Sequence, residues 1–232
     1  MKEGEKQGGR AAEKPKQRQN YALLLERLIQ EQGGRRPRLL LHACCAPCSS
    51  AVLEQIARYF RITIYYYNPN IMTEEEFRYR AAELRRLLSE MGLSGIELLV
   101  PAYRHQEFLE IARGLEREPE RGKRCLRCYE QRLRRTAEAL REHNRCADMD
   151  AQFDYFCTTL TISPMKDAQI LNEIGMRIAE ELGLHFLPSD FKKKGGYLRS
   201  TELSREYALY RQDYCGCEFS KAETQRKRRA LS

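Results

Sequence analysis

Short apolar runs alternate with amphipathic segments along most of the chain. The apolar runs are typical of buried strands and cover residues 37–43, 61–67, 96–103, 153–163 and 184–188. Between and before them, apolar positions recur every three or four residues, which predicts helices over residues 21–32, 49–60, 73–92, 105–115, 125–143 and 167–183. Residues 189–220 indicate a loop, a further helix and a cysteine pair. This alternation predicts an α/β fold with a five-stranded parallel sheet and helices on both faces.

Local signals place some of the helix ends. Ser49 and Ser50 are suited to capping the helix that follows the first strand. Thr73 and Glu76 stand in capping-box register, and Gly92 is expected to end that helix. In a parallel sheet, ligands bind beyond the carboxyl ends of the strands, so the segments that follow each strand are the expected site of function.

Composition divides the chain into three parts. Residues 1–20 are polar and are expected to be a disordered basic tail, residues 21–220 a single α/β catalytic domain, and residues 221–232 a second basic tail. The two tails supply seven of the eight net positive charges. The overall charge is therefore weak support for a nucleic-acid partner, and local clusters of charge are more informative.

Two clusters inside the predicted domain carry four cations each and no anion, in Lys192–Arg199 and Arg121–Cys128. Gly195 and Gly196 in the first cluster would let the backbone approach a phosphate. The candidate phosphate contacts are Lys192, Lys193, Lys194 and Arg199, followed by Arg124 and Arg127.

The compartment affects how the nine cysteines are interpreted. No apolar run is long enough to span a bilayer and the N-terminus has no apolar signal segment, so we expect a cytoplasmic protein. Cysteines in a reducing compartment are more often metal ligands or catalytic groups than disulfide partners. We expect Cys157, which lies in an apolar strand, to be a buried hydrophobic residue and Cys146 to have no role in binding.

The other seven cysteines form three tight groups: Cys44, Cys45 and Cys48; Cys125 and Cys128; Cys215 and Cys217. A four-cysteine zinc site or a single redox-active dithiol would each leave some of these groups unexplained. An iron–sulfur cubane beside a second metal accounts for more of them, because a cubane takes up to four thiolates. Adjacent Cys44 and Cys45 point in different directions and could serve two neighbouring sites.

Several of these motifs together resemble the QueH-type epoxyqueuosine reductases. The motifs are LLLHACCAPCSS, YYYNPNI, RCLRCYEQRL, SPMKD and DFKKKGGYLRSTELSREYALYRQDYCGCEFS, and the resemblance covers about residues 37–220. It implies the last step of queuosine synthesis, in which the epoxide of epoxyqueuosine in the tRNA wobble position is reduced. It also implies an adenine-nucleotide α-hydrolase-like (HUP-type) fold and independence from cobalamin.

The resemblance further implies a [4Fe–4S] cluster beside a separate metal of the iron type. Cys44, Cys45, Cys125, Cys128, Cys215 and Cys217 match the metal-binding positions. Cys48 stands where some members have an aspartate, and a thiolate there can also ligate iron. The sequence does not divide the seven cysteines between the two metals.

Removing an epoxide oxygen as water takes two electrons and two protons. The electrons are expected to come from an external donor of the ferredoxin or flavodoxin type through the cluster. We expect Cys44, Cys48, Asp190 and Tyr214 to take part in catalysis, and the possible proton donors are His42, Tyr66, Tyr67, Asp190 and Tyr214. Asn68 and Asn70 either hold a turn or contact substrate hydroxyls, and Lys166 is a candidate phosphate or ribose contact.

Two other functions remain open at this point. A tRNA thiolase of the ATP-pyrophosphatase type shares this kind of fold, but a glycine-rich phosphate loop is expected after its first strand, where this chain has CCAPCSS. A non-catalytic, zinc-dependent RNA-binding module would hold zinc instead of iron and sulfide.

Overall fold

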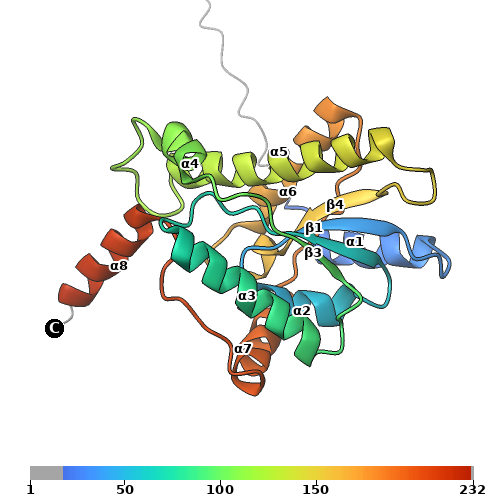
Figure 1. The fold of residues 1–232 in the computed structure, drawn as a ribbon, viewed down its shortest axis with the longest axis horizontal. Helices are drawn as coiled ribbons and strands as arrows, with labels where there is room; N and C mark the ends of the chain where they lie inside the picture. Colours follow the sequence, from blue (N-terminus) through green and yellow to red (C-terminus); the bar gives the residue numbers. More distant parts are fainter. Residues whose placement is uncertain (1–17, 231–232) are drawn as a thin grey trace, which may run out of the picture.

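The computed structural model describes residues 18–230, and most of the predicted disordered tail at residues 1–20 lies outside this range. Four parallel strands form one sheet in the order β3-β2-β1-β4 (Figure 1). They are β1 (Arg38–His42), β2 (Arg61–Tyr65), β3 (Glu97–Leu99) and β4 (Tyr155–Thr158). The α/β class and the parallel sheet are confirmed, whereas the predicted number of five strands is wrong.

Eight α-helices and one short 3₁₀ helix connect and cover the strands in the described part of the chain. They are α1 (Tyr21–Glu31), α2 (Ala46–Ile56), α3 (Glu74–Glu90), α4 (His105–Ala112), α5 (Lys123–Cys146), η1 (Thr159–Ile162), α6 (Ala168–Leu182), α7 (Gly196–Glu206) and α8 (Glu218–Arg229). No helix among these residues is long and apolar enough to cross a membrane.

Helices cover both faces of the sheet, as the alternating pattern predicts. Side chains alternate along a strand, so Leu39 and Leu41 of β1 face one way and Leu40 faces the other. The first face packs against residues of α1, α2, α3 and α7. The second packs against α5 and α6, through residues such as Leu133 and Leu171. β1, β2 and β4 are buried between these two layers beyond their first residues, which explains their largely apolar sequences, whereas the short edge strand β3 is mostly exposed.

The predicted fifth strand forms only one bridge to the sheet, between Phe186 and Phe156. Pro188 has no N–H to donate. Beyond it, the backbone of Ser189 bonds to the buried side chain of Asn172 instead of to a strand, both through its N–H and through its C=O, each at 2.8 Å. The side chain of Asn172 in α6 thus takes the place of a neighbouring strand, and the β-pairing of this segment ends after one residue.

Two other element boundaries differ from the prediction. Cys45, and neither serine, caps α2; Ser49 and Ser50 lie inside the helix and donate to the carbonyls of Cys45 and Pro47. The predicted strand 153–163 ends at Thr158, whose hydroxyl accepts a hydrogen bond from Leu160 N and starts η1.

The N-terminus of α3 can be compared with the predicted capping box. The predicted cap at Thr73 is confirmed, because its hydroxyl accepts from Glu76 N at 3.3 Å.

At the C-terminus, α8 occupies most of the segment that composition assigns to a basic tail. The boundary expected at residue 220 therefore falls within the first turn of a helix.

The Gly195–Gly196 pair is required by the fold itself. Gly195 caps α7 with a positive φ of 78°, and a Cβ on Gly196 would lie 1.9 Å from the carbonyl oxygen of Phe191. The turn that leads into α7 therefore needs glycine at both positions, whatever else it contacts.

We expect Gly196→Ala to lower the free energy of unfolding by about 1–3 kcal/mol, because the added methyl overlaps a backbone oxygen that cannot move aside freely. Gly95→Ala is the matched control, since nothing lies within 4 Å of the Cβ it would add. Urea unfolding of both variants tests the assignment. Equal stability of the two would show that the turn has room for a side chain.

Candidate metal centre at the carboxyl edge of the sheet

The segments that follow β1, β2 and β4 enclose a cavity of about 230 Å³ at the carboxyl edge of the sheet. Cys44 and Cys45 follow β1 after Ala43, and Cys48 lies in the first turn of α2. Asn68 and Asn70 follow β2, and residues 160–166 follow β4. The loop after α7 closes the remaining side with residues 211–215. The site therefore lies where a parallel sheet is expected to bind its ligand.

Cys44, Cys45 and Cys48 form a compact trio that lines this cavity. Their sulfur atoms lie within 4.8 Å of one another, and those of Cys44 and Cys45 are 3.8 Å apart. A tetrahedral metal with bonds of about 2.3 Å to sulfur holds its ligands about 3.8 Å apart. The trio thus has the spacing needed for one mononuclear metal, with one coordination position left for another ligand.

Hydrogen bonds inside the trio make its three thiols unequal. Bonds from the Cys44 and Cys48 thiols lower the pKa of Cys45 well below its usual range. Bonds to Cys44 and Cys45 raise the pKa of Cys48. Cys45 is therefore the first of the three to become a thiolate, which is the form that binds a metal.

The remaining clustered cysteines form a quartet from two helices and a loop. Cys125 and Cys128 lie in the first two turns of α5, Cys217 caps α8, and Cys215 precedes it. Cys128 and Cys217 pack in one apolar cluster with Phe108. Burial, and then interaction with the Cys215 and Cys217 thiols, raises the pKa of Cys128 to about 12. Among the described residues the trio is the one group of three or more ligand atoms that lies close enough to hold a single ion, so the quartet is less compact.

Each cysteine group lies at the N-terminus of a helix: α2, α5 or α8. Free backbone N–H groups and the helix dipole favour negative charge at such ends. Cys125 Sγ accepts from Arg121 N at 3.3 Å, and Cys217 Sγ accepts from Ser220 N at 3.4 Å. These N–H groups favour the thiolate form of Cys125 and Cys217, but burial outweighs them and raises the pKa of both thiols.

Two buried or half-buried cations lie among the cysteines. Arg132 is 1% exposed, and its Nε donates to the Cys128 carbonyl at 3.2 Å. Burial opposes the charge of Arg132, but the surrounding thiols, Cys128 first, hold its pKa above the ordinary value. Lys166 lines the cavity, and interactions with Cys215 and Cys44 likewise outweigh burial and raise its pKa. These positive charges would offset the negative charges of metal-bound thiolates.

Three polar atoms of cavity-lining residues are buried without a hydrogen-bond partner. They are Asn70 Oδ1, Gln212 Oε1 and Arg132 Nη2. Buried polar atoms are nearly always paired in folded proteins, so three on one cavity indicate a polar ligand. Asn68 differs, because its amide donates to the Ala43 carbonyl at 2.9 Å and holds the turn.

The chain is similar in sequence to known epoxyqueuosine reductases. The family model described as epoxyqueuosine reductase QueH matches residues 39–223. The chain belongs to the QueH family. It is 39% identical to the epoxyqueuosine reductase QueH of Staphylococcus epidermidis over 211 residues, which is 88% of this chain and 85% of that protein.

Two more distant members have the same description. The Streptococcus pyogenes protein is 38% identical over 211 residues, covering 89% of this chain and 80% of its own. The Thermotoga maritima protein is 30% identical over 194 residues, covering 84% of this chain and 95% of its own. The resemblance carried by the cysteine motifs is therefore confirmed.

Among the proton-donor candidates of this QueH-family chain, only Tyr214 lines the cavity. His42 is fully buried between Thr158 Oγ1 and the Tyr67 carbonyl, and burial, followed by the charge of Arg132, lowers its pKa to about 4. It is therefore neutral at physiological pH. Tyr66 donates to the Phe77 carbonyl at 3.4 Å and packs in the core.

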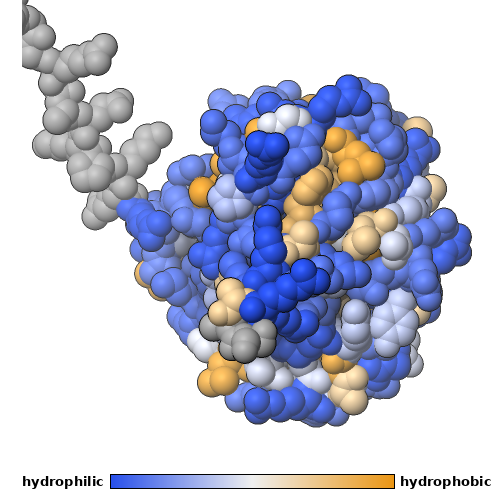
Figure 2. All heavy atoms as spheres, turned by 90° about the vertical axis from the view of Figure 1, so that its left-hand side faces the viewer, coloured by the Kyte–Doolittle hydropathy of each residue, from blue (hydrophilic) through white to orange (hydrophobic). Residues whose placement is uncertain are grey.

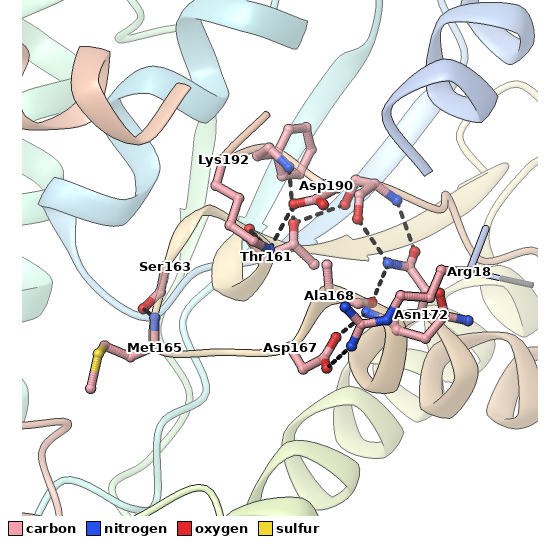
Figure 3. A network of polar contacts seen from close by, with 12 residues as sticks. Arg18, Thr161, Ser163, Met165, Asp167, Ala168, Asn172, Asp190 and Lys192 are labelled. Carbon is pink, nitrogen blue, oxygen red and sulfur yellow. Dashed lines mark hydrogen bonds and ion pairs between the residues drawn. The ribbon is translucent and has the colours of Figure 1, made fainter. Parts of the chain in front are cut away.

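Tyr67 and Asp190 also lie away from the cavity. The Tyr67 hydroxyl donates to the carboxylate of Glu107 in a separate groove. Asp190 accepts from Lys192 Nζ at 2.7 Å, and Lys192 also donates to the Thr161 carbonyl at 3.4 Å (Figure 3). Asp190 thus belongs to a neighbouring polar network, and its expected catalytic role finds no support in its position.

The predicted phosphate contacts fall into different environments. Arg124 is 2% exposed, and its Nη1 donates to the carbonyls of Leu115, Glu116 and Glu118. It holds the loop before α5 and is not available to a phosphate. Arg127, Lys193 and Lys194 are exposed. Lys194 pairs with Glu26, and Arg199 pairs with Glu54 at 2.7 Å.

The two isolated cysteines differ as expected. Cys157 is fully buried in β4, and its Sγ donates to the Leu187 carbonyl at 3.1 Å. Cys146 is exposed at the end of α5. Neither lines the cavity. Arg132 and Gln212 are the residues of this site that sequence reasoning missed, and no motif of the single sequence distinguishes them from other arginines and glutamines.

Proposed function

We propose that this member of the QueH family reduces epoxyqueuosine in tRNA to queuosine with a [4Fe–4S] cluster on the quartet and one metal ion, most simply iron, on the trio. The observation that carries the proposal is the separation of seven thiols into a compact trio that lines a cavity and a wider quartet, of which Cys215 lines the same cavity. Four thiolates suit a cubane, whose ligands lie farther apart than those of a single ion. The parallel sheet with two helical layers also supports the proposal of an adenine-nucleotide α-hydrolase-like fold.

The two metal groups would supply what side chains cannot. When bound, they would pass electrons one at a time from an external donor of the ferredoxin or flavodoxin type and offer a Lewis-acidic position to the epoxide oxygen, without cobalamin. Two electrons and two protons convert that oxygen to water and leave the ring as an alkene.

The side chains of the cavity position the substrate and balance charge. The unpaired oxygens of Asn70 and Gln212 would accept hydrogen bonds from substrate hydroxyls or amines. Arg132 and Lys166 would offset the negative charge of the thiolates. The cavity is small, so we expect the modified base to be turned out of the anticodon loop to enter it.

Tyr214 is the proposed proton donor. It lines the cavity next to Cys215, and burial raises the pKa of its hydroxyl above the usual value, so the hydroxyl keeps its proton at neutral pH. The guanidinium of Arg80 lies 5.5 Å from the centre of its ring and limits that rise. A protonated phenol beside the reacting oxygen is suited to protonate it as it leaves.

The tRNA would be held by cations that line the surface grooves outside the cavity. Arg127 and Lys193 are exposed, and Lys192, Lys194 and Arg199 form ion pairs that a phosphate could replace at small cost. Arg124 is left out of this set because it is buried. Because tRNA is modified in the cytoplasm, the same proposal places the protein there.

An anaerobic turnover assay tests the function. We expect the reconstituted chain, given a strong reductant and tRNA that carries epoxyqueuosine, to yield the nucleoside lacking one oxygen, as read by mass spectrometry. Cys44→Ala and Cys215→Ala should abolish the conversion, because each removes a proposed metal ligand. Cys157→Ala is the control and should stay active, since Cys157 lies away from the cavity. Unchanged substrate with an intact cluster would refute the function.

Tyr214→Phe tests the proton donor. We expect it to lower kcat by about 10²- to 10⁴-fold, the usual contribution of general acid catalysis, without changing the iron content. Tyr210→Phe is the matched control, because the Tyr210 hydroxyl bonds to Glu76 outside the cavity. Full activity of Tyr214→Phe would assign the proton to another group or to water.

A further inference from the structure

Helix α8 extends from the body of the molecule with almost no packing of its own (Figure 1). Only Ser220 of this helix is buried, and residues 225–230 are all exposed. A helix of this length is marginal in water, so its persistence depends on contacts at its first turns. The last turn contributes nothing to the core.

The first turns of α8 are fixed to residues beside the metal centre. Phe219 contacts Phe108, and the Arg124 guanidinium stacks on the Phe219 ring at 4.6 Å. Lys221 Nζ lies 5.7 Å from the centre of the Tyr214 ring, and Glu223 accepts from Glu120 N at 2.8 Å. Both Tyr214 and Glu120 line the cavity. Helix α8 therefore starts at the cavity mouth in a set orientation.

The far end of α8 is strongly positive. Its last turn carries Arg226, Lys227, Arg228 and Arg229. Lys227 pairs with Glu223 and Arg228 with Asp213, and the cation of each pair is exposed to solvent, so each pair contributes little net stability. Neighbouring like charges on a helix repel one another and destabilise it, and a bound polyanion would reduce this repulsion. The surrounding face is also predominantly hydrophilic (Figure 2).

The length of α8 determines which part of a substrate it can reach. Twelve residues at about 1.5 Å each place the end of α8 about 18 Å from its start. The side chain of Arg228 reaches back to Asp213, which lines the cavity, whereas the helix itself continues past it. Phosphates next to a base in the cavity lie much closer than about 18 Å. The family model ends at residue 223, so the last-turn cations lie beyond the matched segment.

We propose that α8 is a phosphate-binding arm that contacts the anticodon stem of the tRNA while the modified nucleotide of the loop occupies the cavity. This inference rests on the proposed function, because it takes tRNA as the substrate. Arginine-rich helices bind phosphates through paired N–H groups. An acidic electron-donor protein fits less well, since docking of two proteins requires a broad surface of roughly 1,000 Å² in total, whereas α8 is a narrow, projecting helix.

Neutralising the arm tests this inference. The arm variant is Arg226→Gln with Lys227→Gln and Arg228→Gln, and the matched control is Arg35→Gln with Arg61→Gln and Arg85→Gln. All six positions are exposed, and Arg35 and Arg61 lie at the opposite, amino edge of the sheet. Each full-length, reconstituted protein is titrated with an anticodon stem-loop and with the single-stranded loop oligonucleotide at several salt concentrations.

We expect the arm variant to bind the stem-loop roughly tenfold more weakly and with a salt slope smaller by about 3, the effect of losing three phosphate contacts. Its affinity for the loop oligonucleotide should match that of the wild type, and the control should match the wild type on both RNAs. Equal weakening on both RNAs would place the arm at the loop and overturn the inference.

Three further results would also overturn it. Equal losses in the arm variant and the control would mean a general effect of charge. Unchanged RNA binding with slower turnover by a ferredoxin- or flavodoxin-type donor would make α8 a docking site for that protein, and unchanged binding with unchanged turnover would leave it no role in either. If the wild type itself bound neither RNA, the proposed function would fail, and the inference that rests on it would fail with it.

Discussion

The accumulation of negative charge at the carboxyl edge of the sheet is the constraint on which this end of the molecule depends. Seven thiols lie in two adjacent groups, and each must lose its proton to bind a metal. Three helix N-termini and the cations Arg132 and Lys166 surround them. Without these positive groups the thiolates would repel one another across a small, poorly solvated volume.

The same arrangement separates structural from chemical roles. Asn68 and Arg124 donate hydrogen bonds to backbone carbonyls and so fix the loops that carry the cysteines. Gly216, with a φ of 125°, separates Cys215 from Cys217 where a Cβ would meet the side chains of Asn70 and Ile71 within 3.2 Å. The unpaired atoms of Asn70 and Gln212 are left for a ligand. The rigid groups hold the site, and the unsatisfied groups define what it binds.

Much of this could be predicted from the sequence, and the failures have physical causes. Strand–helix alternation predicts the parallel sheet because both faces must be covered, and the cysteine motifs carry the family. The fifth strand is lost because Asn172, distant in sequence, takes the backbone of Ser189. The sequence predicts Arg124 to be a surface cation, because no local pattern reveals the three carbonyls to which its side chain donates. Arg124 and Arg132 are two of several arginines on α5, and only the packing of that helix decides that these two are buried.

The central claim is that the trio and the quartet hold different metals. Mössbauer spectroscopy of the anaerobically reconstituted, iron-57-loaded chain tests it most directly, together with metal and sulfide analysis. The account predicts one [4Fe–4S] cluster and a second, mononuclear iron signal, and Cys48→Ala should weaken or remove only the mononuclear signal. A colourless protein with a single zinc ion, or loss of the cluster with the mononuclear signal retained in Cys48→Ala, would contradict it.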